Sequence, residues 1–590
     1  MQQSQDFYKR QLSLHQTQVA KLFKTLSLLS LLRLAVFLLT VAGIYYNFQK
    51  WNYALGIALF GTVVFLLLLT RYSAIKVQRK LHQQLIAINK KELKIASGDF
   101  HSFDDGANYL DPSHAYSTDI DLFGRGSFFQ YINRTGLTEG TNTLAGYLNS
   151  NSTNNIINKQ EAIKELSNDP EWIQNYTALA MILNQEERPS DIVKWLNGYK
   201  PFLKPFHRVL ALVFGLSSLL LFVLFFSEII EVEILGYWLL FGLGITSIFL
   251  KRINGLAFRS SKAKDLIRQY SKLLLEIEQR TFSSTLLKSY QDQIVKEGES
   301  ASTVFKKFSK ALDALDHRNN LIAAVLGNGF FLWDIMQAFR IESWIHNYGG
   351  LAQKWFAVVA EFDAYNSLGT FAFNHQKFSY PNIIDSEEMV KVKALGHPLI
   401  AEDKRICSDF EIKDQQFFII TGANMAGKST FLRAVALHNV MANMGLPVCA
   451  KESMYQPIKL ISSMRTSDSL ADESSYFFSE LTRLKFIVET LKKERYFVIL
   501  DEILKGTNST DKAKGSKKFV ERLLSLKACG IIATHDLSLT ELDQTQPLVK
   551  NYFFDADIKD DELYFDYSLK EGVCQNMNAS FLLRKMGIVK

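Results

Sequence analysis

The sequence is poor in cysteine and carries no strong net charge. Its cysteines form no C-x-x-C pair, so neither a zinc site nor a disulfide framework is indicated, and reduced structural cysteines are expected. The four are Cys407, Cys449, Cys529 and Cys574. The net charge of +7 is mild for 590 residues and comes partly from basic residues beside apolar segments, so it does not argue for DNA binding. The length leaves room for roughly three or four domains.

A phosphate-binding loop is the most informative pattern. The segment 421–430 reads T-G-A-N-M-A-G-K-S-T, follows the apolar run 417–420 and opens a helix-like segment. Its spacing fits G-x-x-x-x-G-K-[ST], in which backbone N–H groups cradle phosphates, Lys428 reaches the β- and γ-phosphates and Ser429 holds Mg²⁺. The pattern predicts ATP and Mg²⁺ as cofactors. The predicted nucleotide-contacting residues are Gly422, Ala423, Asn424, Met425, Ala426, Gly427, Lys428, Ser429 and Thr430.

Two further strand-like runs end in candidate catalytic residues. The run 496–500 precedes Asp501, predicted to orient Mg²⁺, and Glu502, predicted to polarise the attacking water. The alternative is two exposed acids that merely end a strand. A third run, 531–533, leads to His535, which would contact the γ-phosphate or the water, although a lone histidine there is more often structural. The order of glycine loop, acidic strand end and strand-histidine favours an ABC-type ATPase.

A candidate signature segment, 474–481, lies between the first two motifs. In ABC-type ATPases this segment completes the site of the partner subunit. Ser475 therefore predicts a homodimer through the ATPase domains, with two shared sites.

With these motifs the chain resembles the MutS family, the ATPases of DNA mismatch repair and their relatives. Family members carry T-G-P-N-M-G-G-K-S-T, from which this chain departs at Ala423 and Ala426. Residues 468–475 are similar to the family's signature helix, and 501–507 to its acidic strand and loop. The resemblance implies an α/β ABC-type P-loop ATPase domain beside an all-α core or lever domain. The departures, which include Leu504-Lys505 for a glycine-arginine pair, bear on rate rather than on ATP binding.

The upstream region resembles the family's core domain. Residues 119–135 are similar to a stretch that ends in Asn-Arg-Thr, and 160–170 to the helix that follows, so the likeness would cover roughly two-thirds of the chain. Residues 263–296 and 302–320 have apolar positions at helical spacing and are expected to be lever helices, with solvated charged helices as the plain alternative. The family's mismatch-reading domain, with its F-x-E motif, is absent before the core, so mismatch repair is not expected.

Four apolar stretches have lengths near the ~20 residues that span a membrane. The first pair is 26–46 and 53–70, and the second pair, 209–226 and 234–250, interrupts the core-like region where family members extend to their DNA clamp. Buried core helices are the alternative. Basic residues flank the ends away from the short connectors, which predicts cytoplasmic soluble parts. They are Lys21, Lys24, Arg71, Lys76, Arg79, Lys80, Lys200, Lys204, Arg208, Lys251 and Arg252.

Two expectations concern the remainder of the ATPase domain. By resemblance, the adenine-stacking aromatic should fall near Arg405-Ile406, and Arg405 could stack instead. Past His535, the aromatic runs 552–554 and 563–565 look like a hairpin, and 579–588 is similar to the family's last helix.

The expected organisation has six parts: an N-terminal cytoplasmic segment (1–25), a transmembrane hairpin (26–70), the first part of the core domain (71–206), a second transmembrane hairpin (207–250), lever helices (251–375) and the ATPase domain (376–590).

The expected function is that of a membrane-anchored, MutS-like ATPase of the inner or plasma membrane. It would hydrolyse ATP in a dimer and pass the nucleotide state through the lever helices to its membrane part or to an unknown protein partner. One alternative is a membrane-tethered protein that recognises nucleic-acid structures. The other is an ABC-type transporter, which would need polar groups along a path through the bilayer, and the spans offer few.

Overall fold

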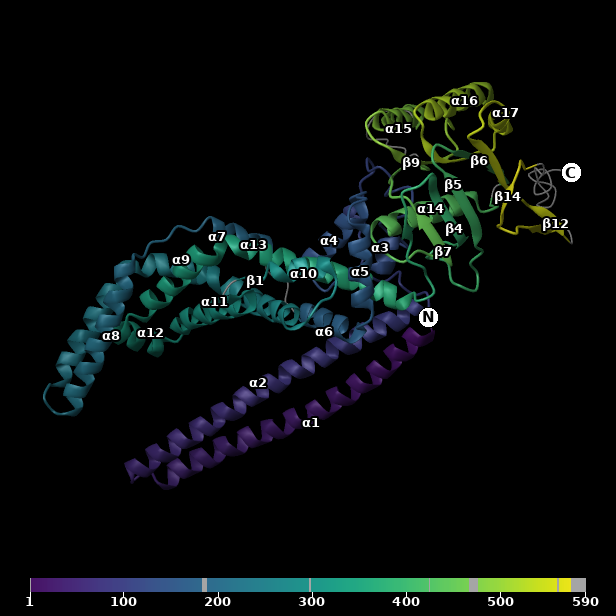
Figure 1. The fold of residues 1–590 in the computed structure, drawn as a ribbon. Coiled ribbons are helices and arrows are strands. Elements are labelled where there is room, and N and C mark those ends of the chain that lie inside the picture. Colours follow the sequence, from purple (N-terminus) through teal and green to yellow (C-terminus); the bar gives the residue numbers. More distant parts are fainter. Residues whose placement is uncertain are drawn as a thin grey trace.

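The molecule is elongated and has an α/β domain at one end (Figure 1). This computed structural model describes residues 2–182, 188–296, 299–423, 425–465, 476–559 and 562–574. Long helices make up the rest of the molecule, and two helical hairpins extend from it away from the α/β domain.

The first hairpin consists of α1 (Gln2–Tyr46) and α2 (Trp51–Ala96), which pack along each other. Neither helix contains a proline, so nothing in the sequence interrupts them, and both extend well beyond their apolar parts. Of the segment 1–25, expected as an N-terminal cytoplasmic segment, residues 2–25 form the first half of α1. The segment 71–96, expected in the core domain, continues α2. The helices approach closely at Gly61, where a Cβ would lie 2.1 Å from the Thr40 hydroxyl.

The second hairpin consists of α8 (Pro205–Phe226) and the first part of α9 (Val232–Gln279), whose later part runs into the helical body. The ring of Trp238 stacks on Phe214 at 4.5 Å, and its indole N–H donates to Ser218 Oγ at 2.7 Å. Within the described residues, α1, α2, α8 and α9 are long and apolar enough to cross a membrane. At most 17% of the apolar window in any of these four helices is buried, so their apolar side chains are left largely uncovered by the protein.

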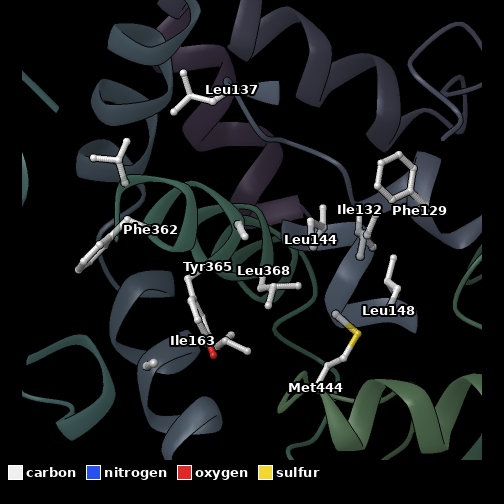
Figure 2. Packing of buried hydrophobic residues seen from close by; sticks show 14 of the residues in the cluster. Phe129, Ile132, Leu137, Leu144, Leu148, Ile163, Phe362, Tyr365, Leu368 and Met444 are labelled. Carbon is white, nitrogen blue, oxygen red and sulfur yellow. The ribbon is translucent and has the colours of Figure 1, made fainter. Parts of the chain in front are cut away.

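The helical body is organised around α13 (Trp333–Asn374), a 42-residue helix that contacts helices from both sides of the second hairpin in sequence. Figure 2 shows Phe362, Tyr365 and Leu368 of α13 among apolar residues of the surrounding helices. The other elements are η1 (Ala107–Tyr109), α3 (Phe128–Ile132), α4 (Thr138–Asn149), α5 (Ile156–Ser167), α6 (Pro170–Met181), α7 (Pro189–Asn197), α10 (Thr285–Asp292), β1 (Val295–Lys296), β2 (Glu299–Ser300), α11 (Ala301–Asp316), η2 (His317–Asn319) and α12 (Leu321–Phe331).

The α/β domain contains a six-stranded sheet in the order β14-β11-β6-β10-β9-β8. Its five strands from β11 to β8 are mutually parallel, and β14 is antiparallel. The strands are β6 (Phe417–Gly422), β8 (Lys459–Ser463), β9 (Tyr496–Asp501), β10 (Cys529–Ala533), β11 (Val549–Phe554) and β14 (Leu569–Glu571). The domain's helices are α14 (Lys428–Asn443), α15 (Tyr476–Leu491), α16 (Ser509–Ser525), η3 (Leu537–Glu541) and α17 (Leu542–Thr545).

A second sheet of four strands has the order β3-β7-β4-β5. Its strands are β3 (Asn382–Ile383), β4 (Glu388–Leu395), β5 (Ser408–Lys413) and β7 (Glu452–Tyr455), and a separate hairpin pairs β12 (Asp557–Lys559) with β13 (Glu562–Tyr564). The predicted pairing of 552–554 with 563–565 is therefore wrong. Residues 552–554 belong to β11, which pairs with β6 and β14, because central strands of a parallel sheet are also continuous apolar runs.

The loop that holds Asp119 and Asp121 joins the helical body to the α/β domain. The buried carboxylate of Asp119 accepts from Ser462 Oγ at 2.6 Å and from the backbone N–H of Arg465 at 2.8 Å. Asp121 accepts from both terminal nitrogens of Arg465, at 2.6 and 3.1 Å. The guanidinium of Arg483 on α15 donates to the backbone oxygens of Ala115 and Ser462. We call these contacts the core–ATPase joint.

A second joint links the first hairpin to the helical body. Glu92 of α2 is buried and pairs with the buried guanidinium of Arg134. The same carboxylate accepts from the Asn374 amide at the end of α13, at 2.8 Å. Because removing one partner of a buried pair leaves an uncompensated charge, this contact fixes where α2 meets the core.

Candidate active site

Three neighbouring strands end at one edge of the six-stranded sheet. In the parallel register, Ala533 of β10 lies opposite Ile420 of β6 on one side and Asp501 of β9 on the other. Because the carboxyl ends of parallel strands meet at one edge, the residues that follow each strand are brought together. The three motifs identified in the sequence therefore meet here.

The glycine loop joins β6 to the first residue of α14. Gly422 and Gly427 have φ of +148° and +106°, backbone conformations that residues other than glycine rarely adopt. A Cβ on Gly422 would also lie 2.5 Å from the backbone oxygen of Phe554. The loop leads directly into the N-terminus of α14, where free N–H groups and the helix dipole favour an anion. Asn424 lies outside the described residues.

Lys428 reaches back over this loop. Its ammonium group donates to the backbone oxygens of Gly422 at 2.8 Å and Ala423 at 2.9 Å. Burial lowers the pKa of Lys428, because desolvation disfavours its charged form. The charge is thus held beside the helix N-terminus, where phosphate oxygens would bind.

Ser429 and Asp501 form the candidate metal position. Ser429 Oγ donates to Asp501 Oδ2 at 2.6 Å, so one hydroxyl and one carboxylate come together from two different motifs. No group of three or more His, Cys, Asp and Glu side chains fit for a metal is found among the described residues. Two oxygen ligands from the protein fit Mg²⁺, which usually keeps waters and binds through one or two protein groups plus substrate phosphates.

Glu502 and His535 form a second pair at the same edge. His535 Nε2 lies 2.8 Å from Glu502 Oε1, and this hydrogen bond lowers the pKa of Glu502 to about 2. Lys428 Nζ lies 3.3 Å from the same nitrogen. Because Nε2 donates to the carboxylate, it does not accept from the lysine.

The backbone of Glu502 is strained, with φ of +49°. Its N–H donates to Ala533 O at 2.9 Å, and this hydrogen bond holds Glu502 in the strained conformation. An ionised carboxylate can accept a proton from water.

The helix α15 supports the loop that follows Glu502. The buried carboxylate of Glu480 accepts from the backbone N–H of Lys505 at 3.0 Å. A Cβ on Gly506 would lie 2.9 Å from the Cβ of Phe477, so helix and loop are in close contact. The predicted signature residue Ser475 lies outside the described residues.

A cavity of about 310 Å³ lies beside the glycine loop and includes Gly427 and Thr430 in its lining. Phe554 and Tyr567 contribute aromatic rings and Ile406 an aliphatic side chain, which suits a flat apolar group such as a nucleotide base. The lining continues with Leu395, Gly396, His397, Ile400, Lys404, Ser408, Phe431 and Ala434.

Arg405 does not line this cavity, contrary to its suggested stacking role. Its guanidinium donates to Ile400 O at 3.0 and 2.5 Å and lies over the ring of Phe378. Tyr567 was missed because it follows β13, far from the glycine loop in sequence. No local motif marks it. Only the placement of β14 at the sheet edge beside β11 brings Tyr567 to the cavity.

Comparisons with known proteins identify the domain. A family model described as MutS domain V matches residues 418–583. The chain is 32% identical over 214 residues to "DNA mismatch repair protein MSH4" of Arabidopsis thaliana, covering 36% of this chain and 27% of that protein. It is 31% identical over 202 residues to "MutS protein homolog 4" of Homo sapiens, covering 32% and 22%. With "DNA mismatch repair protein MutS" of Desulfatibacillum aliphaticivorans it shares 32% over 225 residues, covering 36% and 25%.

These matches confirm one part of the sequence interpretation. MutS domain V is an ABC-type P-loop ATPase, so the α/β domain is an ATPase domain. The chain spans about a quarter of the length of the curated relatives it matches. The overlap also covers about a third of this chain, less than the two-thirds expected.

The aromatic lining of the cavity leads to a prediction. Tyr567→Ala should weaken ATP binding by roughly three- to tenfold, since an aromatic contact contributes about 0.5–1.5 kcal/mol beyond area burial. Fluorescence titration with ATP and with inorganic tripolyphosphate would check this. Tripolyphosphate has no base, so its affinity should be unchanged. Equal losses for both ligands would instead show that Tyr567 supports the glycine loop, against which its ring packs.

Proposed function

We propose that this chain is a membrane-anchored ATPase that hydrolyses ATP and passes the nucleotide state through its helical body to its membrane part or to a protein partner. The observation that carries the proposal is the convergence of Lys428, the Ser429–Asp501 pair and the Glu502–His535 pair at one sheet edge. The match of residues 418–583 to a MutS-type ATPase domain supports it.

In the proposed reaction, water attacks the γ-phosphorus of ATP and the bond from that phosphorus to the bridging oxygen of ADP breaks. Glu502 accepts the proton of the water, while His535 holds its carboxylate in place. Lys428 and the N-terminus of α14 stabilise the negative charge on the phosphates. Ser429 and Asp501 would hold Mg²⁺, which would supply further positive charge at the phosphate oxygens.

The first test separates binding from hydrolysis. Lys428→Ala should abolish ATP binding, because it removes the only buried ammonium group at the glycine loop among the described residues. Glu502→Gln should bind ATP normally but hydrolyse it about 10²–10⁴-fold more slowly, as expected for loss of a general base. Bound nucleotide and phosphate release would be measured, with Glu489→Gln as control, an exposed acid whose partner is Lys492. A normal turnover rate in Glu502→Gln would assign the general base to another group.

The membrane anchor is supported by the composition and exposure of α1, α2, α8 and α9. If these four helices were buried core helices, other parts of the protein would cover their apolar side chains. Four of those side chains are instead each more than 60% exposed, namely Leu39, Phe60, Leu216 and Tyr237. Bilayer acyl chains would cover such surfaces. With the basic flanks on the inner side, the ATPase domain faces the cytoplasm at the inner or plasma membrane.

The two alternatives have less support. Hydroxyl groups in the apolar helices mostly bond to their own backbone, as Thr40 does to Val36, Thr62 to Ala58 and Ser217 to Val213. They are therefore not arranged as a polar path, as a transporter would need. The mild net charge of +7 gives no electrostatic support for DNA binding.

Coupling between nucleotide and membrane is supported by the two joints. Asp119 binds Ser462 at the end of β8 and also Arg465, which lies nine positions before the candidate signature segment (474–481). From the core, Arg134 and Glu92 lead to α2 and hence to the first hairpin. A movement of the signature segment on ATP binding would thus displace the core and its attached helices.

The core–ATPase joint can be tested by distance measurement between two spin labels. With the exposed Cys407 replaced by serine, cysteines at Val77 of α2 and Leu275 of α9 would carry the labels in a Glu502→Gln chain. ATP with Mg²⁺ should change the distance between the labels, and Asp119→Asn should reduce or abolish that change while ATP binding persists. Asp191→Asn is the matched control, since Asp191 is exposed and pairs with Lys194 on its own helix. An unchanged response in Asp119→Asn would remove the joint from the coupling path.

We also propose that the active unit is a homodimer in which Ser475 of one chain completes the site of the other. MutS family proteins dimerise through their ATPase domains, which supports the proposal. Mixing Lys428→Ala chains with Ser475→Arg chains gives heterodimers with one intact composite site and one site that carries both changes. ATPase activity should rise above that of either variant alone. Absence of both rescue and ATP-stimulated crosslinking would reject the shared site.

A further inference from the structure

The short helix α12 (Leu321–Phe331) has an unusual position at the end of the helical body. It is bent by 84° against α13, and the break falls at Leu332, whose φ is +46°. In Figure 1, α12 lies beside the second hairpin. Its eleven residues contain no charged side chain.

The C-terminal end of α12 packs against the apolar part of the second hairpin. A Cβ on Gly242 of α9 would lie 2.2 Å from the backbone oxygen of Gly329, so the two backbones are in close contact. The hydroxyl of Ser218 on α8 donates to the backbone oxygen of Phe330, and the rings of Phe330 and Phe222 lie 4.8 Å apart. The break in the helix leaves the backbone oxygen of Phe330 without a partner in its own helix, and the Ser218 hydroxyl supplies one. In an apolar environment such a backbone oxygen needs a hydrogen-bond donor from the protein.

These contacts fix the depth of α12 relative to the hairpin. At 1.5 Å per residue, Ser218 lies about 20 Å along α8 from Pro205. Glu342 of α13 accepts from the N–H groups of Phe202 and Leu203, just before α8 begins. The start of α13 and the end of α12 therefore extend from the inner end of the hairpin to about its middle.

The outward face of α12 is apolar and is left uncovered by the residues that the structure describes. Leu321 is 77% exposed, Ile322 71% and Leu326 48%. Basic residues of α9, Arg252 and Arg259, follow the apolar part of that helix, where phospholipid headgroups would lie. A solvent-exposed leucine-isoleucine pair beside an apolar hairpin is what a protein leaves for acyl chains to cover.

We propose that α12 is a re-entrant membrane element whose outward face contacts the acyl chains of the inner leaflet. The inference rests on the proposed membrane anchor, because it takes α8 and α9 as spans. The lipid bilayer is chosen as the occupant because α12 packs against α8 and α9, whose exposed apolar side chains the same bilayer would cover. α13 then begins within the membrane and ends at the Glu92–Arg134 joint, through Asn374.

Accessibility of spin labels would test the inference in the full-length protein in phosphatidylethanolamine–phosphatidylglycerol vesicles. Single cysteines would be placed at Ile322 of α12, at Leu216 of α8 and at Leu275 of α9, in a Cys407→Ser chain. All three side chains are exposed, so folding should tolerate the labels. Collision rates with oxygen, which enters bilayers, and with a polar nickel complex, which does not, would be compared.

The ratio of oxygen to nickel collisions at Ile322 should match that at Leu216 and exceed that at Leu275 by several-fold. A ratio at Ile322 equal to that at Leu275, with Leu216 still shielded from nickel, would place α12 in water. That result would overturn the re-entrant position of α12 but leave the proposed membrane anchor standing. Shielding of Ile322 from both reagents would also overturn it, since a second protein copy would then cover the face. Nickel access at Leu216 would instead reject the membrane anchor itself, and the inference with it.

Discussion

The parallel register of β6, β10 and β9 is the constraint on which the candidate site depends. It places Ile420, Ala533 and Asp501 opposite one another, at or near the carboxyl end of each strand. Ser429 then reaches Asp501, and His535 reaches Glu502, across this edge of the sheet. A register slip of one residue would reverse the side of the sheet to which each following side chain points. Because the strands are buried, their register is fixed, and so are the positions of the candidate site residues.

The candidate catalytic motifs could be located in the sequence because each is encoded within a few residues. Gly422 and Gly427 are required by local backbone geometry, and an acid or a histidine directly after a buried strand is placed by that strand alone. The base cavity could not be predicted in this way. Tyr567 reaches it only because β14 returns to the sheet edge, a long-range pairing with no periodic signal. The aromatic run 552–554 was wrongly predicted to pair with 563–565, because a central strand of a parallel sheet is also a continuous apolar run.

Helix positions were predicted better than helix ends. The apolar windows of α1 and α2 were recognised by length, yet both helices continue far beyond them, since polar residues with good helix propensity extend a helix that packing already stabilises. The stretch 119–135 was singled out by its resemblance to a known core domain. Its use of Asp119 and Asp121 to hold Ser462 and Arg465 was invisible in the sequence, because those partners lie more than 300 positions away.

The internal partners of Lys428, Ser429 and Glu502 have a consequence for how the site empties. Each of these three side chains has a hydrogen-bond partner within the protein: loop carbonyls, Asp501 and His535 respectively. Arrival of nucleotide is therefore an exchange of partners, and its departure leaves no buried charge stranded. Such a site can bind and release nucleotide without unfolding its loop, which suits an ATPase that must release its products after every turnover.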